Sequence, residues 1–167
     1  MILIILYLTA IVAANLLVAQ FGVSVVILNA FVFIGLDLTT RDALHEQWQG
    51  RNLWRNMALL IASGSVLSAL LNWQAAPIAL ASFVAFTGAG IADTVTYQLL
   101  GDKTRFIKMN GSNVVSAAVD SILFPAIAFG LPLLLPVMAG QFVAKVAGGF
   151  VWSLILLQVR KRTMAVA

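Results

Sequence analysis

The sequence contains no cysteine and a single histidine, His45. Without cysteine the chain can form no disulfide bond, no thiolate metal site and no cysteine nucleophile. One histidine is too few for a convincing transition-metal cluster, and a solvated surface position is the expected role of His45. A Gly-rich loop that ends in Lys-Ser or Lys-Thr is also absent, so the chain is not predicted to hydrolyse ATP itself. We therefore expect no metal, no other cofactor and no catalytic residue.

Charged residues are scarce, at 10% of the chain against 62% hydrophobic residues, and the mean hydropathy is +1.01. A soluble domain carries about a quarter charged residues. Met1–Leu36 contains no Asp, Glu, Lys, Arg or His at all, whereas a helix that spans a bilayer needs only roughly 20 apolar residues. The composition therefore predicts an integral membrane protein. Met1–Leu36 is expected to form two spans joined by a tight turn near Gln20-Phe21-Gly22.

The apolar segments predict six transmembrane helices, at about residues 2–20, 23–38, 56–73, 76–100, 109–130 and 133–158. All basic residues except Lys145 then fall on one side, in the second and fourth connections and the C-terminal tail. This positive-inside pattern predicts cytoplasmic N- and C-termini, and it explains the net charge of +4 without a nucleic-acid partner. The N-terminus lacks the basic region and cleavage site of a signal peptide. We expect one domain over residues 1–167, an all-α membrane protein built as a compact six-helix bundle.

The polar stretch at about residues 39–55 is expected to be a short cytoplasmic helical connection. Thr39-x-x-Asp42 has the spacing of a capping box, and Gly50 stands where a helix could end. Elsewhere, small residues recur at four-residue spacing, as in Gly64-x-x-x-Ser68 and Ala144-x-x-x-Gly148. Such spacing lets membrane helices approach closely, which supports a compact bundle.

Four ionisable residues fall within the predicted spans or at their edges: Asp37, Asp93, Asp120 and Lys145. At about 1.5 Å of rise per residue, Asp120 and Lys145 lie deep in a hydrocarbon layer of about 30 Å. Two interpretations of this pair stay open. It is either a buried ion pair that locks the fifth span to the sixth, or part of a solute pocket or proton relay. Three acids cannot pair one to one with one base, so at least one carboxyl group needs another partner or a proton.

Polar residues share one face of the fifth span. Asn113 and Ser116 lie seven and four residues before Asp120, and Phe124 lies four residues after it. Pro125 can loosen the helix backbone next to this stripe. An amide, a hydroxyl, a carboxylate and an aromatic ring on one stripe suit a flat, polar heterocycle. A polar seam that only joins helices would carry the same residues, and this alternative also stays open.

Two further pairs of charged residues have alternative interpretations. Asp37 and Arg41 are four residues apart and form either a surface pair or a gate at the mouth of the bundle. Asp93 and Asp120 lie on successive spans, as the two carboxylates of an intramembrane aspartyl hydrolase would. The Gly-x-Gly-Asp element of such proteases is absent. A scaffold or channel-like bundle without transport activity is the remaining alternative.

Four segments together resemble the second, fourth, fifth and sixth helices of the YhhQ-like family, also called the putative vitamin uptake transporter (VUT) family: FVFIGLDLTTRDALHEQW, AFTGAGIADTVTYQLL, GSNVVSAAVDSILFPAIAFG and AGQFVAKVAGGFVWSLILL. The resemblance covers roughly residues 25–160. It implies a six-helix bundle related to the substrate-binding subunits of energy-coupling-factor transporters, in the bacterial cytoplasmic (inner) membrane. The implied activity is uptake of queuosine precursors, which are 7-deazaguanines such as 7-cyano-7-deazaguanine (preQ0) and 7-aminomethyl-7-deazaguanine (preQ1).

The resemblance also implies a set of site residues: Asp37, Asp93, Ser112, Asn113, Asp120, Phe124 and Lys145. A guanine-like edge offers a ring N–H and an amino group, and an ionised carboxylate is the natural acceptor for both. Asp93 and Asp120 are the expected acceptors. Asn113 could complement the adjacent carbonyl of the base, while Phe124 could stack on its ring.

The sequence leaves the energy source, the exact substrate and the assembly open. Uptake could be coupled to a separate energising module, coupled to protons through a buried Asp, or facilitated, and a stand-alone carrier is the favoured reading. The substrate could be preQ0, preQ1, queuine or another vitamin-like heterocycle. The expected partners are this small molecule and the lipid bilayer, with a homodimer as an open alternative.

Overall fold

A computed structural model describes residues 1–48 and 50–166. Within these ranges, the side chains at 46, 105, 106, 109, 157 and 159–166 are not described. Four of the basic side chains behind the predicted topology therefore lie outside the described residues: Arg105, Arg160, Lys161 and Arg162.

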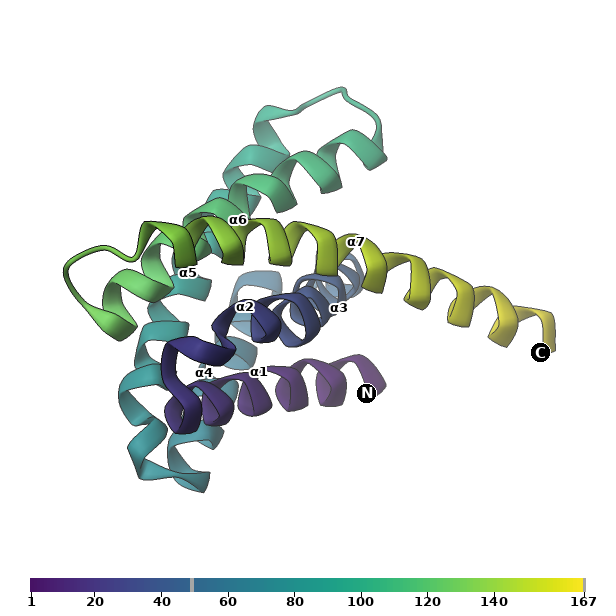
Figure 1. Ribbon diagram of the computed structural model, residues 1–167. Coiled ribbons are helices and arrows are strands. Elements are labelled where there is room, and N and C mark those ends of the chain that lie inside the picture. The colour runs from purple at the N-terminus through teal and green to yellow at the C-terminus, as the bar shows by residue number, and fades with distance from the viewer. Residues whose placement is uncertain (49, 167) are drawn as a thin grey trace.

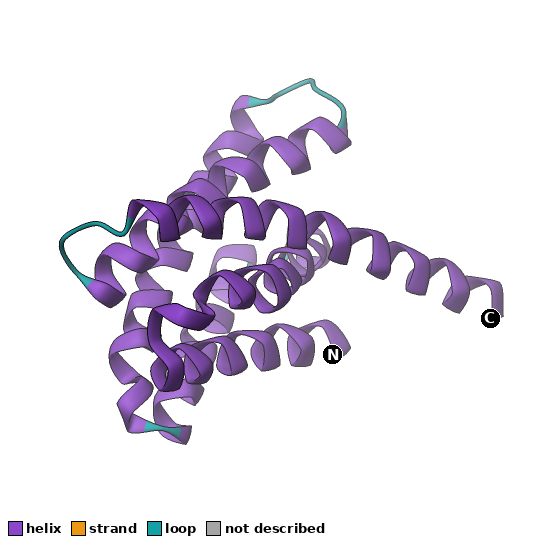
Figure 2. Ribbon diagram, viewed as in Figure 1, coloured by secondary structure: helices purple, strands orange, loops and turns teal. Residues whose placement is uncertain are grey.

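The described chain is helical and contains no strand (Figure 2). Its elements, in order, are α1 (Ile2–Phe21), η1 (Gly22–Val25), α2 (Val26–Asn29), η2 (Ala30–Ile34), α3 (Gly35–Trp48), α4 (Leu53–Leu71), η3 (Trp73–Ala75), α5 (Ala76–Leu99), α6 (Arg105–Phe129) and α7 (Leu135–Val166). η1 and η3 are short 3-10 turns, and η2 is one turn of π-helix within an otherwise α-helical stretch. The predicted all-α fold class is confirmed.

Five helical stretches of the described chain are long and apolar enough to cross a membrane: Ile2–His45, Leu53–Leu71, Trp73–Leu99, Asn110–Phe129 and Leu135–Leu156. The first has 44 residues, about twice the length that one crossing needs. It reverses direction at Gly22, whose φ of 61° favours glycine, and the chain from α2 to α3 runs back beside α1 (Figure 1). The predicted turn near Gly22 is thus confirmed.

Polar and apolar residues are distributed as a lipid environment requires. Large apolar side chains such as Leu70 and Leu99 point outward, with 74% and 80% of their surface exposed. Fourteen polar or charged residues are buried instead: Asn15, Asn29, Asp37, Thr40, Arg41, Ser68, Ser82, Asp93, Ser112, Ser116, Asp120, Ser121, Gln141 and Lys145. Polar groups inside a membrane bundle have to find partners there, because lipid offers none.

The second half of the reversed stretch differs from the prediction. α3 continues without a break through Thr39, so the predicted capping box does not start a new helix. The hydroxyl of Thr39 donates instead to the carbonyl of Gly35 at 2.9 Å, as hydroxyls inside helices often do. Gly50, with a φ of 78°, lies in the turn that follows α3. The helix that contains Asp37 therefore reaches further than the predicted span, which ended at residue 38.

Close helix contacts occur at the small residues. A Cβ atom at Gly148 of α7 would collide with the carbonyl oxygen of Phe31 in η2, and Gly35 faces the same point of α7. On the other side of the bundle, Gly64 of α4 packs against Ile11 of α1. α7 thus lies directly on η2 and α3, which brings its polar residues next to those of α3 and α6.

Candidate functional site

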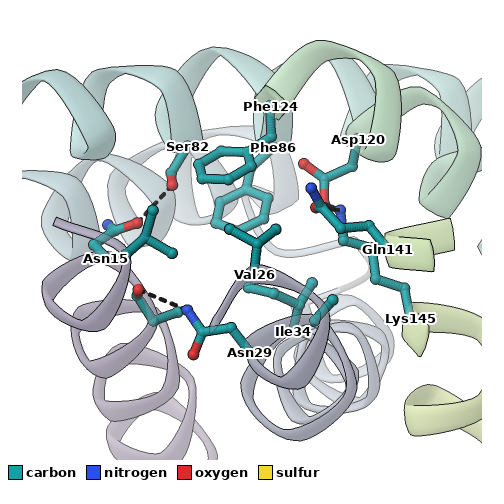
Figure 3. A pocket seen from close by; sticks show the side chains of 13 residues that line it. Asn15, Val26, Asn29, Ile34, Ser82, Phe86, Asp120, Phe124, Gln141 and Lys145 are labelled. Atoms are coloured by element: carbon teal, nitrogen blue, oxygen red, sulfur yellow. Dashed lines mark hydrogen bonds and ion pairs between the residues drawn. The ribbon is translucent and has the colours of Figure 1, made fainter. Parts of the chain in front are cut away.

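A cavity of about 20 Å³ lies where α1, α2, η2, α5, α6 and α7 meet (Figure 3). Thirteen residues line it: Ala14, Asn15, Val18, Val26, Asn29, Ala30, Ile34, Ser82, Phe86, Asp120, Phe124, Gln141 and Lys145. Its volume is enough for about one water molecule. Six of the lining side chains are polar and seven are apolar, so the cavity is a mainly apolar space that polar groups enter.

An ion pair between α6 and α7 forms one wall of the cavity. The Nζ of Lys145 lies 2.7 Å from Oδ2 of Asp120, and both side chains are almost completely buried. Lys145 also donates to Oε1 of Gln141, one helical turn earlier, at 3.0 Å. The predicted ion pair is therefore present. It also lines the cavity, so the two sequence-based interpretations of these residues are compatible.

The opposite wall is a hydrogen-bonded network from three other helices. Ser82 of α5 donates to Oδ1 of Asn15 at 2.6 Å. The amide nitrogen of Asn15 donates in turn to Oγ of Ser68 in α4, at 3.0 Å. The phenyl rings of Phe86 and Phe124 lie between this network and the Asp120–Lys145 pair (Figure 3). The centre of the cavity is thus aromatic, and its two ends are polar.

Three polar atoms of the lining have no hydrogen-bond partner among the described residues. They are Oδ1 of Asn29, Oδ1 of Asp120 and Nε2 of Gln141. Leaving a buried polar group unpaired costs about 1–3 kcal/mol, and such groups are rare in folded proteins. The cavity therefore offers two acceptors and one donor to a water molecule or a ligand.

The predicted stripe on α6 divides into two parts. Asp120 and Phe124 line the cavity. Ser116 accepts a hydrogen bond from Arg41 at 2.9 Å, and Asn113 donates to Oδ2 of Asp42 at 2.7 Å, so both side chains bind α3. The reason is the length of α3, which continues to Trp48 and so places Arg41 and Asp42 within hydrogen-bond reach of α6. Ser112, which the resemblance implied, is buried on the same part of α6.

Asp37, Arg41 and Asp93 form the core of a second buried group, outside the lining of the cavity. Asp37 is 0% exposed and Arg41 is 3% exposed, so their interpretation as a surface pair is wrong. Of the two carboxyl groups in the aspartyl-hydrolase alternative, Asp120 is paired with Lys145. Asp93 does not reach the cavity that Asp120 lines.

Residues 3–159 match the family described as "Putative vitamin uptake transporter". The chain belongs to that family. No curated protein and no solved structure is similar enough to the chain to count as a match. The predicted resemblance is thereby confirmed at the level of the family.

In this member of the vitamin uptake transporter family, the cavity is also lined by residues that the sequence did not predict as site residues. Asn15 and Asn29 line it from the N-terminal segment, which had been read only as an uncharged pair of spans. The signal available was their rarity, because they are the only Asn residues among the first 36 positions. Gln141 lies four residues before Lys145, and this spacing alone places both on one helix face.

Proposed function

We propose that this chain takes up a queuosine precursor, a 7-deazaguanine such as preQ0 or preQ1, and binds it in the cavity between Asn15 and Lys145. Membership of a vitamin uptake family supports transport as the activity. The choice of base rests on one observation, the three unpaired polar atoms beside the two phenyl rings. Ionisable and polar groups inside a membrane bundle commonly mark the path of a solute.

The unpaired atoms complement a guanine-like base. Oδ1 of Asp120 and Oδ1 of Asn29 accept hydrogen bonds, while Nε2 of Gln141 donates. A 7-deazaguanine carries ring N–H and amino donors together with one carbonyl acceptor, so each free atom has a counterpart. Phe86 and Phe124 supply flat apolar surfaces for stacking. A purely apolar vitamin would leave all three polar atoms unpaired, at a cost in affinity.

Binding requires the cavity to widen, because a cavity of about 20 Å³ is much smaller than a two-ring base. The phenyl rings occupy its centre and are the groups that have to move (Figure 3). Phe124 is followed by Pro125 inside α6. Proline removes a helical N–H, so the carbonyl one turn earlier loses its partner and the helix bends more easily there. The described conformation corresponds in this proposal to the closed carrier.

In the proposed topology the chain crosses the bacterial inner membrane six times, and both termini lie in the cytoplasm. It is supported by the reversal at Gly22, which divides the first stretch of 44 residues into two crossings. In Figure 1 both termini lie on the right, and the turn between α1 and α2 lies on the left with the loop before α7. From η1 to the end of α3 the chain rises about 40 Å, so the end of α3 would project beyond a hydrocarbon layer of about 30 Å. This projection is the proposed cytoplasmic part of the 39–55 segment.

Three expectations stay predictions. They are a relationship to the substrate-binding subunits of energy-coupling-factor transporters, a separate energising module, and a homodimer. Asp93, Asn113 and Ser116 also stay proposed contributors to substrate binding. Since they lie on α5 and α6 outside the lining of the cavity, they would contact the base only as the carrier opens toward α3.

The test is thermal unfolding of the detergent-purified protein with preQ0, preQ1, queuine, guanine, biotin and riboflavin. A ligand at about 100 times its Kd raises the free energy of unfolding by about 2.7 kcal/mol. We expect a deazaguanine to stabilise the parent protein and the control Asp102→Asn, whose site is exposed, but not Asp120→Asn. Stabilisation by another vitamin alone would reassign the substrate. Stabilisation by none of the six would refute the assignment of the cavity.

A further inference from the structure

A second buried polar group lies outside the lining of the cavity, and its carboxyl groups are not among the three unpaired atoms assigned to the base. We call it the α3 cluster; it consists of Tyr7 on α1, Asp37 and Arg41 on α3, Asp93 on α5 and Ser116 on α6. None of these five residues has more than 6% of its surface exposed. Three helices therefore bring ionisable groups to one buried place, and α6 adds a hydroxyl group. Burial of such groups in a membrane bundle is costly and calls for a function.

Arg41 is the cation of the α3 cluster. It donates to Oγ of Ser116 and lies within electrostatic reach of Asp37 and Asp93. Its guanidinium group stays charged under all ordinary conditions. A metal cation at the same place would be repelled by this charge. This repulsion disfavours a sodium ion next to the guanidinium group.

The buried charges of the described residues do not balance. The buried acids are Asp37, Asp93 and Asp120, whereas the buried bases are Arg41 and Lys145. Lys145 is taken by Asp120. Arg41 alone is left to compensate two carboxyl groups, so one of the two has no countercharge. An uncompensated charge at this depth costs several kcal/mol, and binding a proton removes that cost.

Asp37 is the carboxyl group without a hydrogen bond in the described part of the chain, and it shares the charge of Arg41 with Asp93. Both of its oxygens lack a hydrogen-bond partner among the described residues, whereas only Oδ1 of Asp93 does. The hydroxyl of Tyr7 lies against Asp37 but falls outside ordinary hydrogen-bond geometry. We infer that Asp37 is a proton-binding site that couples uptake of the base to an inward proton gradient. This inference rests on the proposed function and adds its energy source.

The groups that face Asp37 come from every helix around it. α1 contributes Tyr7, α3 itself contributes Arg41 and Asp42, and Asp120 acts from α6. Asp93 of α5 acts on Arg41, and Lys145 of α7 is held by Asp120. The one titratable residue of α4, Arg55, is exposed, and η1, α2 and η2 contain none.

Two features connect Asp37 to the cavity. The like charge of Asp120 acts on Asp37 directly, so any change in the Asp120–Lys145 pair changes the free energy of ionising Asp37. In addition, the π-helical turn η2 lines the cavity with Ala30 and Ile34, and Asp37 follows within the next turn. π-Helical turns are frequent at functional sites and can change register. A base that opens the cavity would therefore also act on the position of Asp37.

The transport cycle balances with one proton per base. A proton from the outer side forms an O–H bond with a carboxylate oxygen of Asp37, and this bond breaks again when the proton leaves to the cytoplasm. No other bond changes. With a neutral base, each cycle moves one positive charge inward. One pH unit across the membrane then supports about a tenfold accumulation of the base, since about 1.4 kcal/mol corresponds to a factor of ten.

The test uses the full-length protein in liposomes with radiolabelled preQ0 or preQ1. Wild-type protein should accumulate the base about tenfold per unit of an inward pH gradient, and a protonophore should abolish the accumulation. A sodium gradient should have no effect. Asp37→Asn imitates the protonated carboxyl group, so this variant should equilibrate the base without concentrating it. The matched control Asp102→Asn, at an exposed loop position, should accumulate the base like the parent.

Opposite results have defined meanings. Gradient-driven accumulation by Asp37→Asn, or its loss in Asp93→Asn alone, would overturn the assignment of the proton to Asp37. Accumulation driven by sodium would overturn proton coupling. If no deazaguanine is transported by any variant, the proposed substrate fails, and infrared spectroscopy of the purified protein still tests the proton. The carbonyl band of a protonated carboxyl group should be present in the parent and diminished in Asp37→Asn; an unchanged band would refute the site.

Discussion

Breaking the ion pair between Asp120 and Lys145 is the most direct perturbation of the cavity. The two charged atoms are 2.7 Å apart, and their side chains are only 6% and 2% exposed. Lys145→Met leaves the carboxylate of Asp120 buried without its countercharge. Removing one partner of such a pair costs about 3–5 kcal/mol. Asp120→Asn leaves the ammonium group of Lys145 unpaired and should cost a similar amount.

The double variant Asp120→Asn/Lys145→Met separates the ion pair from other effects. It removes both charges, so neither one remains buried alone. We expect it to cost clearly less stability than the two single changes summed, with a coupling energy of at least about 2–3 kcal/mol. Replacing a buried pair by neutral groups is often without net cost.

The assay is equilibrium unfolding in mixed micelles with increasing sodium dodecyl sulfate, followed by circular dichroism. Asp102→Asn and Lys103→Met, single and combined, serve as the matched control, because both side chains are exposed. Their effects should stay within about 0.5 kcal/mol and add. If the costs of Asp120→Asn and Lys145→Met also add, the ion pair does not stabilise the bundle and the reasoning is refuted.

Three further predictions concern helix contacts, the first turn and the cavity. Gly148→Ala should lower the free energy of unfolding by about 1–3 kcal/mol, because its Cβ would collide with the carbonyl of Phe31. Gly149→Ala, whose Cβ would make only an ordinary contact, should be neutral in the same unfolding assay. Equal effects of the two changes would contradict this prediction. Gly22→Ala should cost about 1–3 kcal/mol through its φ of 61°. Its control is Gly90→Ala, which meets nothing within 4 Å in a helix and should be neutral or stabilising. Gln141→Met removes the free donor of the cavity and the acceptor for Lys145, so it should lower the free energy of unfolding by about 1.5–3 kcal/mol and weaken binding of a deazaguanine about tenfold by calorimetry; unchanged affinity would exclude Gln141 from the site.

Much of the fold was predictable from the sequence. The helices α4, α5 and α6 lie close to the predicted spans, and the turn at Gly22 is where the uncharged segment was divided. The reason is that lipid offers no hydrogen bonds, so each apolar segment must satisfy its own backbone as a helix. Helical rise likewise placed Asp120 and Lys145 at depth, and charge arithmetic suggested their pairing. These conclusions need only local composition and spacing.

The tertiary structure decided which groups meet. The sequence predicted Arg41 as a surface or gate residue. In the structure α3 continues past Thr39 and places Arg41 against the buried Ser116. Of the predicted stripe on α6, Ser116 and Asn113 form hydrogen bonds with α3, and only Asp120 and Phe124 line the cavity. Periodicity determines which side chains share a face. The neighbour that a face meets depends on how two helices rotate and approach each other, and contacts such as that between Gly148 and Phe31 set this only in the folded bundle.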